Sequence, residues 1–155
     1  MEKNAATGAG LRPYECVVIM NPDSPIEAQK DLMRKNKKII EDHKGRISSM
    51  ETWGRRSLWN PIQKNDKGIF FHTTFYADSD AVAELERTMR INERVFRYFN
   101  MRLEDGTDLV AYLEKFKADV AAAQQNERER EVRSAERRAA GRRFDSGGRS
   151  DEEES

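Results

Sequence analysis

The sequence is organised around residues 51–62, which read Glu51-Thr52-Trp53-Gly54-Arg55-Arg56-Ser57-Leu58-Trp59-Asn60-Pro61-Ile62. Apolar and polar side chains alternate loosely in this stretch, and because Trp and Leu favour a pleated, half-buried surface, we predict a strand. Gly54 indicates a bulge or a close backbone approach, and Pro61 indicates an edge or a strand end. On such a strand, Arg55 and Arg56 point to opposite faces.

The composition of this strand is compatible with two interpretations. An Arg pair beside exposed aromatic rings suits RNA, because guanidinium groups contact phosphates and rings stack on bases. An edge strand with solvated arginines would have the same composition. These residues alone leave both interpretations open.

Upstream of this strand, the sequence predicts a further strand and a helix. Residues 12–20 are dense in β-forming side chains and end at Asn21-Pro22. A helix is then predicted, with Ser24 as its cap, Pro25 in its first position and Glu27 completing a capping box. Gly45 is the expected terminator of this helix.

Downstream, the sequence predicts a turn, two more strands and a second helix. The second strand is expected over residues 46–59, with the turn signal Asn-Asp-Lys-Gly at residues 65–68. A third strand follows at residues 68–76. Asp78-Ser79-Asp80 offers several helix caps, and apolar residues at helical spacing predict a helix to about Asn92. The fourth strand is predicted over residues 95–103.

The resulting order is βαββαβ, which is the ferredoxin-like α+β arrangement. Right-handed crossovers place both helices on one face of a four-stranded antiparallel sheet. The other face stays open and carries Val17 and Ile19. We therefore expect that open face to be a binding surface.

The domain organisation follows from shifts in composition. Residues 1–11 are expected to be a flexible arm, residues 12–104 the ferredoxin-like domain, residues 105–143 a helical, charged extension, and residues 144–155 an acidic disordered tail. Within the extension, an apolar stripe predicts a third helix from Gly106 to Gln125. Beyond Asn126 the stripe is lost, and we expect helix there only when the segment is bound.

Overall composition points to a cytoplasmic protein without a membrane span. The chain has 28 basic and 28 acidic residues, so its net charge implies no partner. The single Cys16 excludes an internal disulfide and is expected to be a small core residue. No apolar run approaches the about 20 residues of a membrane helix, the first residues do not form a signal peptide, and neither His lies within a metal-ligand pattern.

With the predicted fold, a set of residues resembles the family of bacterial small-subunit ribosomal protein number six (S-six). The resemblance runs from about Arg12 to Leu103, and the second-strand motif is its most specific part. The chain departs from the family at Trp59 and Asn60, where Ala and Tyr are usual. The residues that carry the resemblance are Tyr14-Glu15, Asn21-Pro22, Trp53-Gly54-Arg55-Arg56, Leu58, Pro61-Ile62, Lys64 and Arg90-Ile91-Asn92.

The resemblance implies a structural component of the small ribosomal subunit that binds the central domain of small-subunit ribosomal RNA. It also implies a protein partner, ribosomal protein S-eighteen, with no catalysis, no cofactor, no metal and no small-molecule substrate. The strand ends and loops supply the candidate contacts. For RNA these are Arg12, Trp53, Arg55, Arg56, Lys64, Arg90, Arg94 and Arg97, and for the partner they are Trp59, Pro61 and Ile62.

Other proteins of this topology remain as alternatives. An acylphosphatase needs a Gly-containing phosphate loop after the first strand, whereas this turn has two prolines and no Gly. An RNA-recognition motif needs a consensus on the third strand that Lys67-Gly68 and the following residues match only in part. A non-ribosomal dimeric regulator or interaction module of this fold is the main alternative.

Overall fold

The computed structural model describes residues 10–145, so most of the predicted arm and acidic tail lie outside the described residues. The elements in chain order are β1 (Arg12–Met20), α1 (Ile26–Asp42), β2 (Arg46–Ile62), β3 (Asn65–Ala77), α2 (Ser79–Arg90), β4 (Val95–Arg102) and α3 (Leu109–Asp145).

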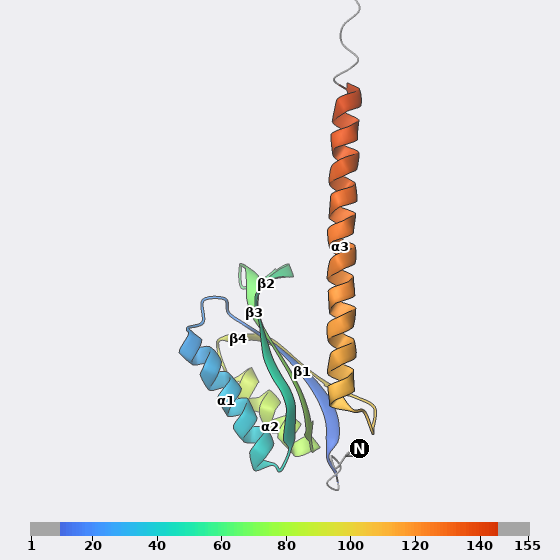
Figure 1. Ribbon diagram of the computed structural model, residues 1–155. Helices are drawn as coiled ribbons and strands as arrows, with labels where there is room; N and C mark the ends of the chain where they lie inside the picture. The colour runs from blue at the N-terminus through green and yellow to red at the C-terminus, as the bar shows by residue number, and fades with distance from the viewer. Residues whose placement is uncertain (1–9, 146–155) are drawn as a thin grey trace, which may run out of the picture. The chain divides into compact units, whose positions relative to one another are not determined.

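The four strands form one antiparallel sheet in the order β2-β3-β1-β4. The helices α1 and α2 lie side by side on one face of this sheet (Figure 1). The ferredoxin-like prediction is confirmed, and β1 is a central strand because it pairs with both β3 and β4. β2 and β4 are the two edges.

The main core lies between the sheet and the two helices. From β1 it takes the alternate residues Tyr14, Cys16, Val18 and Met20, which are all buried, as the period of two in a strand requires. The helices contribute apolar residues at helical spacing. These core residues of α1 and α2 are Leu32, Ile39, Ile40, Ala81, Leu85 and Met89.

The hairpin between β2 and β3 differs from the prediction. Its turn is at Gln63-Lys64, with φ of 48° and 65°, and Ile62 pairs with Asn65. Positive φ at both central residues is what a two-residue type I′ turn requires. The predicted turn at residues 65–68 is wrong, because those residues belong to β3. Gly68 is required by close packing: a Cβ at this position would lie 2.6 Å from Cγ2 of Ile19.

The helix starts agree with the prediction only for α2. The Asp78 side chain caps α2 by accepting a hydrogen bond from the Ala81 backbone at 2.8 Å. The capping box predicted for α1 is wrong: Pro25 is the N-cap, and no side chain caps the helix. Ser24 is buried just before it, where its carbonyl accepts a hydrogen bond from the Gln29 side chain at 3.0 Å.

The third helix is longer than predicted. It begins at Leu109 rather than Gly106 and continues to Asp145, through the segment for which helix was expected only on binding. The chain separates into two compact units within this helix, the first ending at Leu113 and the second beginning at Glu114. The first turn of α3 therefore belongs to the ferredoxin-like unit.

Candidate nucleic-acid interface

Six of the eight residues predicted to contact RNA are cations on elements at the end of the sheet where β1 ends. Arg55 and Arg56 of β2 pair with Ile69 and Gly68 of β3, and Arg97 of β4 pairs with Ile19 near the end of β1. The backbone carbonyl of Arg94 accepts a hydrogen bond from Asn21, which follows β1. We call these six residues the basic end: Arg55, Arg56, Lys64, Arg90, Arg94 and Arg97.

Neutral acceptors orient the arginines of the basic end. Arg55 donates from Nη2 to the Pro22 carbonyl at 2.7 Å. Arg56 lies over the ring of Trp53, with its Cζ 5.8 Å from the ring centroid, and donates to the Trp53 carbonyl at 3.3 Å. The two neighbouring arginines thus diverge, as the sequence predicted.

Within the described residues, no member of the basic end forms an ion pair with a carboxylate. The cations on the helices contrast with this pattern. Arg34, Lys38 and Arg87 each pair with an acid three or four residues away. Positive charge is therefore compensated at these three positions of α1 and α2 and left uncompensated at the basic end.

The three residues predicted to contact a protein partner lie at the end of β2. Trp59 is fully exposed, Pro61 is exposed and Ile62 is half-buried. The strand pairing skips from Ser57 to Ile62, so Trp59 and Pro61 lie in an irregular part of the hairpin. Trp59 belongs to the same hairpin as Lys64, a member of the basic end.

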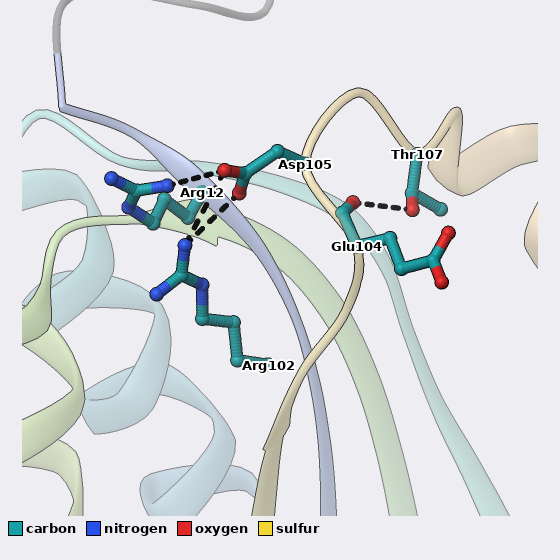
Figure 2. A network of polar contacts seen from close by, with 5 residues as sticks. All are labelled: Arg12, Arg102, Glu104, Asp105 and Thr107. Atoms are coloured by element: carbon teal, nitrogen blue, oxygen red, sulfur yellow. Dashed lines mark hydrogen bonds and ion pairs between the residues drawn. The ribbon is translucent and has the colours of Figure 1, made fainter.

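Arg12 lies at the opposite end of the sheet from the basic end. Its Nη1 donates to Asp105 Oδ2 at 2.6 Å, and Arg102 reaches the same carboxylate at 3.2 Å (Figure 2). Hydrogen bonds from Arg12 and then Arg102 hold the pKa of Asp105 below its usual value. The structure thus gives Arg12 a contact that fixes the segment between β4 and α3.

Further contacts attach the start of α3 to the domain. The Thr107 hydroxyl donates to the Glu104 carbonyl at 2.6 Å (Figure 2). The Tyr76 hydroxyl donates to the Thr107 carbonyl at 3.1 Å and accepts from the Leu109 amide at 3.3 Å. Leu109 is fully buried against Tyr76 in a small second core with Leu11 and Leu103.

A buried polar chain that the sequence did not predict crosses the face of the sheet away from α1 and α2. Glu15 accepts from His72 Nε2 at 2.7 Å and from the Tyr112 hydroxyl at 2.6 Å. Trp53 stacks on the His72 ring with centroids 4.9 Å apart. This polar network links β1, β2, β3 and α3. Its one signal in the sequence was Glu15, a charged residue within an otherwise apolar strand.

Hydrogen bonding determines the protonation of this chain. The pKa of Glu15 is lowered, chiefly by the hydrogen bond from His72 and also by that from Tyr112, against the opposing effect of burial. Burial and the bond to Glu15 raise the pKa of Tyr112 to about 12. At neutral pH the carboxylate is therefore ionised and the phenol is neutral.

The remainder of the open face is an apolar patch. Val17, Ile19 and Phe70 are half-buried there, and Phe99 and Met101 on the edge strand β4 are exposed. Register places Phe99 opposite Val17 and Met101 opposite Glu15. The patch borders the basic end through Arg97.

The structure assigns the remaining candidate groups to other roles. Cys16 is 3% exposed, and its burial, with nearby Glu86 and Glu15, raises its pKa to about 12, so it is an inert core thiol. Among residues 10–145, His, Cys, Asp and Glu side chains form no cluster able to hold a metal ion. No helix in the same range has the length and apolarity needed to cross a membrane.

Comparison with known proteins gives a consistent result. The family model described as Ribosomal protein S6 matches residues 13–102. The Small ribosomal subunit protein bS6 of Bdellovibrio bacteriovorus is 52% identical over 117 residues, which cover 76% of this chain and 77% of the relative. That alignment is longer than the stretch matched by the family model. The protein of the same name from Citrifermentans bemidjiense is 40% identical over 100 residues, 64% of this chain and 73% of the relative.

A solved structure agrees with the fold. The crystal structure of 30S ribosomal protein S6 from Thermotoga maritima superposes with a TM-score of 0.56 at 29% identity, covering 70% of this chain and 98% of the other. These matches decide against a non-ribosomal regulator. The chain belongs to the ribosomal protein S6 family, the S-six family indicated by its second-strand motif, and is a non-enzymatic structural protein of the small ribosomal subunit.

Proposed function

We propose that this protein binds the central domain of small-subunit ribosomal RNA through the basic end, together with ribosomal protein S-eighteen. The observation that carries the proposal is the set of six cations at one end of the sheet, none of which forms an ion pair within residues 10–145. Because uncompensated cations attract phosphates and release counterions, such a surface supplies affinity for any RNA backbone.

The aromatic residues beside the basic end support RNA over other polyanions. Trp59 is fully exposed near the hairpin turn, and Trp53 lies under Arg56. RNA in ribosomes has loops and bulges whose bases stack on aromatic rings or on guanidinium planes. Phosphate contacts by Arg55 and Arg90 would position the protein, with Trp53 as the aromatic contact beside them.

The edge strand β2 and the hairpin support a protein partner. Among the described strands β2 pairs with β3 alone, so its outer edge offers backbone groups to a partner, and Pro61 blunts that edge at one end. Trp59 and Ile62 add apolar surface at that end. S-eighteen would cover this region and meet the RNA beside the basic end.

The test is a titration of a central-domain RNA fragment with this protein, with S-eighteen, and with both. We expect weak binding by either protein alone and much tighter joint binding, because a single continuous surface then meets the RNA. By linkage, the RNA must strengthen the contact between the two proteins by the same factor. Independent binding, with no gain from mixing, would contradict the proposal.

A further inference from the structure

In the second compact unit, the part of α3 from residue 121 onward has no buried side chain among the described residues. Every described side chain from Ala121 to Arg143 is exposed, including Val132 at 56%. Residues 126–143 contain seven arginines and four glutamates and no aromatic residue. Apolar packing therefore does not explain this part of α3, and its charged side chains are the groups available for an interaction.

The charges are not evenly distributed around the helix. At 3.6 residues per turn, Arg130, Arg133 and Arg137 are spaced by three and four and lie on one face. All four glutamates lie more than about 70° of helix rotation from the centre of that face. We call these three residues the arginine stripe.

Small residues flank the arginine stripe. Ser134, Ala140 and Gly141 lie on or beside the same face. Within the described residues, no stripe arginine forms an ion pair. Like charges three and four residues apart weaken an isolated helix, and a bound anion would offset that repulsion.

We propose that the arginine stripe binds the phosphate backbone of double-stranded RNA, as a second contact separate from the basic end. The planar guanidinium group of Arg can donate two hydrogen bonds to phosphate oxygens. The small side chains beside the stripe let the helix approach the RNA backbone closely. Single-stranded RNA is a poorer fit, because residues 126–143 offer no ring on which a base can stack. The A-form major groove is too narrow for side chains, so the stripe meets phosphates at the wide, shallow groove.

This inference rests on the proposed function, in that it takes RNA as the partner. The two contacts differ in chemistry. The basic end lies beside Trp53, and an aromatic ring among cations suits irregular RNA, whereas the stripe has cations alone, which suits a regular duplex. The contact is accordingly independent of sequence, and it lengthens the RNA surface that the protein covers.

The test uses the full chain, with S-eighteen present, in two matched variants. The first is Arg130→Gln, Arg133→Gln and Arg137→Gln. The control is Arg128→Gln, Arg138→Gln and Arg142→Gln, which removes the same charge from other faces of the same helix. Because Gln and Arg have similar helix propensity, circular dichroism should show equal helicity in both variants.

The measurement is the salt dependence of binding to a central-domain RNA fragment, to a plain RNA duplex and to a single strand of equal length. On the central-domain fragment and the duplex, we expect the stripe variant to lower the slope of log K against log salt by about one for each phosphate that is no longer bound. The control should lower it by less than about one. On the single strand, the stripe variant should bind like the wild type.

Several outcomes would overturn the inference. Equal decreases in both variants would show a general effect of charge, and no decrease in either would show that the helix does not touch RNA. Loss of S-eighteen with RNA binding retained would identify a protein as the occupant. Substitution of Arg55, Arg56 and Arg90 in the same assay separates the two proposals: if only that variant changes the slope, the proposed function stands and the stripe proposal fails.

Discussion

At the scale of single residues, Glu15 is the group on which the open face depends. It lies on the central strand, 6% exposed, and accepts hydrogen bonds from His72 and from Tyr112. A buried carboxylate is stable only when it is paired or hydrogen-bonded. Tyr112, at the start of α3, therefore completes the solvation of a group on β1, 97 residues earlier in the chain.

Replacing Tyr112 with Phe tests this interaction. The aromatic ring stays while the hydrogen bond to Glu15 is removed, so we expect a decrease of about 1 kcal/mol in the free energy of unfolding. That corresponds to a fall of about 4–8 °C in Tm for a domain of roughly 100 residues. Tyr98→Phe is the matched control, since that hydroxyl only accepts a 3.4 Å bond from Arg90, and it should leave Tm nearly unchanged.

The ionisation of Glu15 predicts a pH dependence. Because the pKa of Glu15 is lowered in the folded state, its ionised form stabilises the protein above the unfolded-state pKa of about 4.3. That stability is lost as pH falls through the lower, folded-state pKa. We expect the wild type to exceed Glu15→Gln in Tm at pH 5, and the difference in Tm to narrow as pH falls below about 4.3.

Asp105 also titrates in this acidic range, but both proteins keep it, so its contribution cancels in the comparison. The measurement is thermal unfolding of both proteins at matched ionic strength. A gap that stayed constant down to a pH of about 3 would show that the Glu15 carboxylate is not specifically stabilised.

At the scale of elements, the end of β2 and the turns around it concentrate charge without compensation. β2 brings two arginines, the turn to β3 brings Lys64, and α2 ends in Arg90. The antiparallel register brings Arg55 and Arg56 beside the last residues of β1, and the turn continues the same hairpin. A strand, a turn and a helix end thus contribute cations to the same end of the sheet.

Neutralising Arg55, Arg56 and Arg90 together tests that surface. With S-eighteen present, the slope of log K against log salt for the central-domain RNA should fall by about one for each phosphate contact removed. The matched control neutralises Arg34, Lys38 and Arg87, which are ion-paired on the helices. If both triples changed the slope equally, the basic end would have no special role.

At the scale of the whole molecule, the buried apolar core lies in the first compact unit. Deleting residues from Asn126 onward should change the Tm of the protein by no more than about 1–2 °C, because the described residues removed bury no apolar side chain. Differential scanning calorimetry of both chains measures this. A drop of several degrees would mean that this part of the chain contributes to the core.

The sequence predicted the order of elements because the apolar periodicities of β1, α1, β3 and α2 are strong. It failed where local residues carry little signal. Gln63 and Lys64 are not typical turn formers, yet they make the turn, because pairing of Ile62 with Asn65 decides its place. Pro25 took the cap position of α1, so the predicted role of Ser24 was not realised.

The candidate site was predictable to the extent that topology determines it. Strand ends and turns locate the six residues of the basic end, and antiparallel pairing brings them together. Arg12 could not be separated from them by sequence, because its partner Asp105 is 93 residues away. The chain of Trp53, His72, Glu15 and Tyr112 depends on contacts of the same long range, for which no local pattern exists.

The pairing of β1 with β4 also has a consequence for how the chain is made. Tyr14 of β1 pairs with Arg102 of β4, so β1 has both of its neighbouring strands, β3 and β4, only after β4 has been synthesised. Until then, one edge of an apolar central strand is open to other nascent chains. Non-local pairing of this kind makes folding slower than in helical proteins of similar size. The domain therefore becomes self-contained late in its synthesis, when Tyr112 follows β4 and reaches the waiting carboxylate of Glu15.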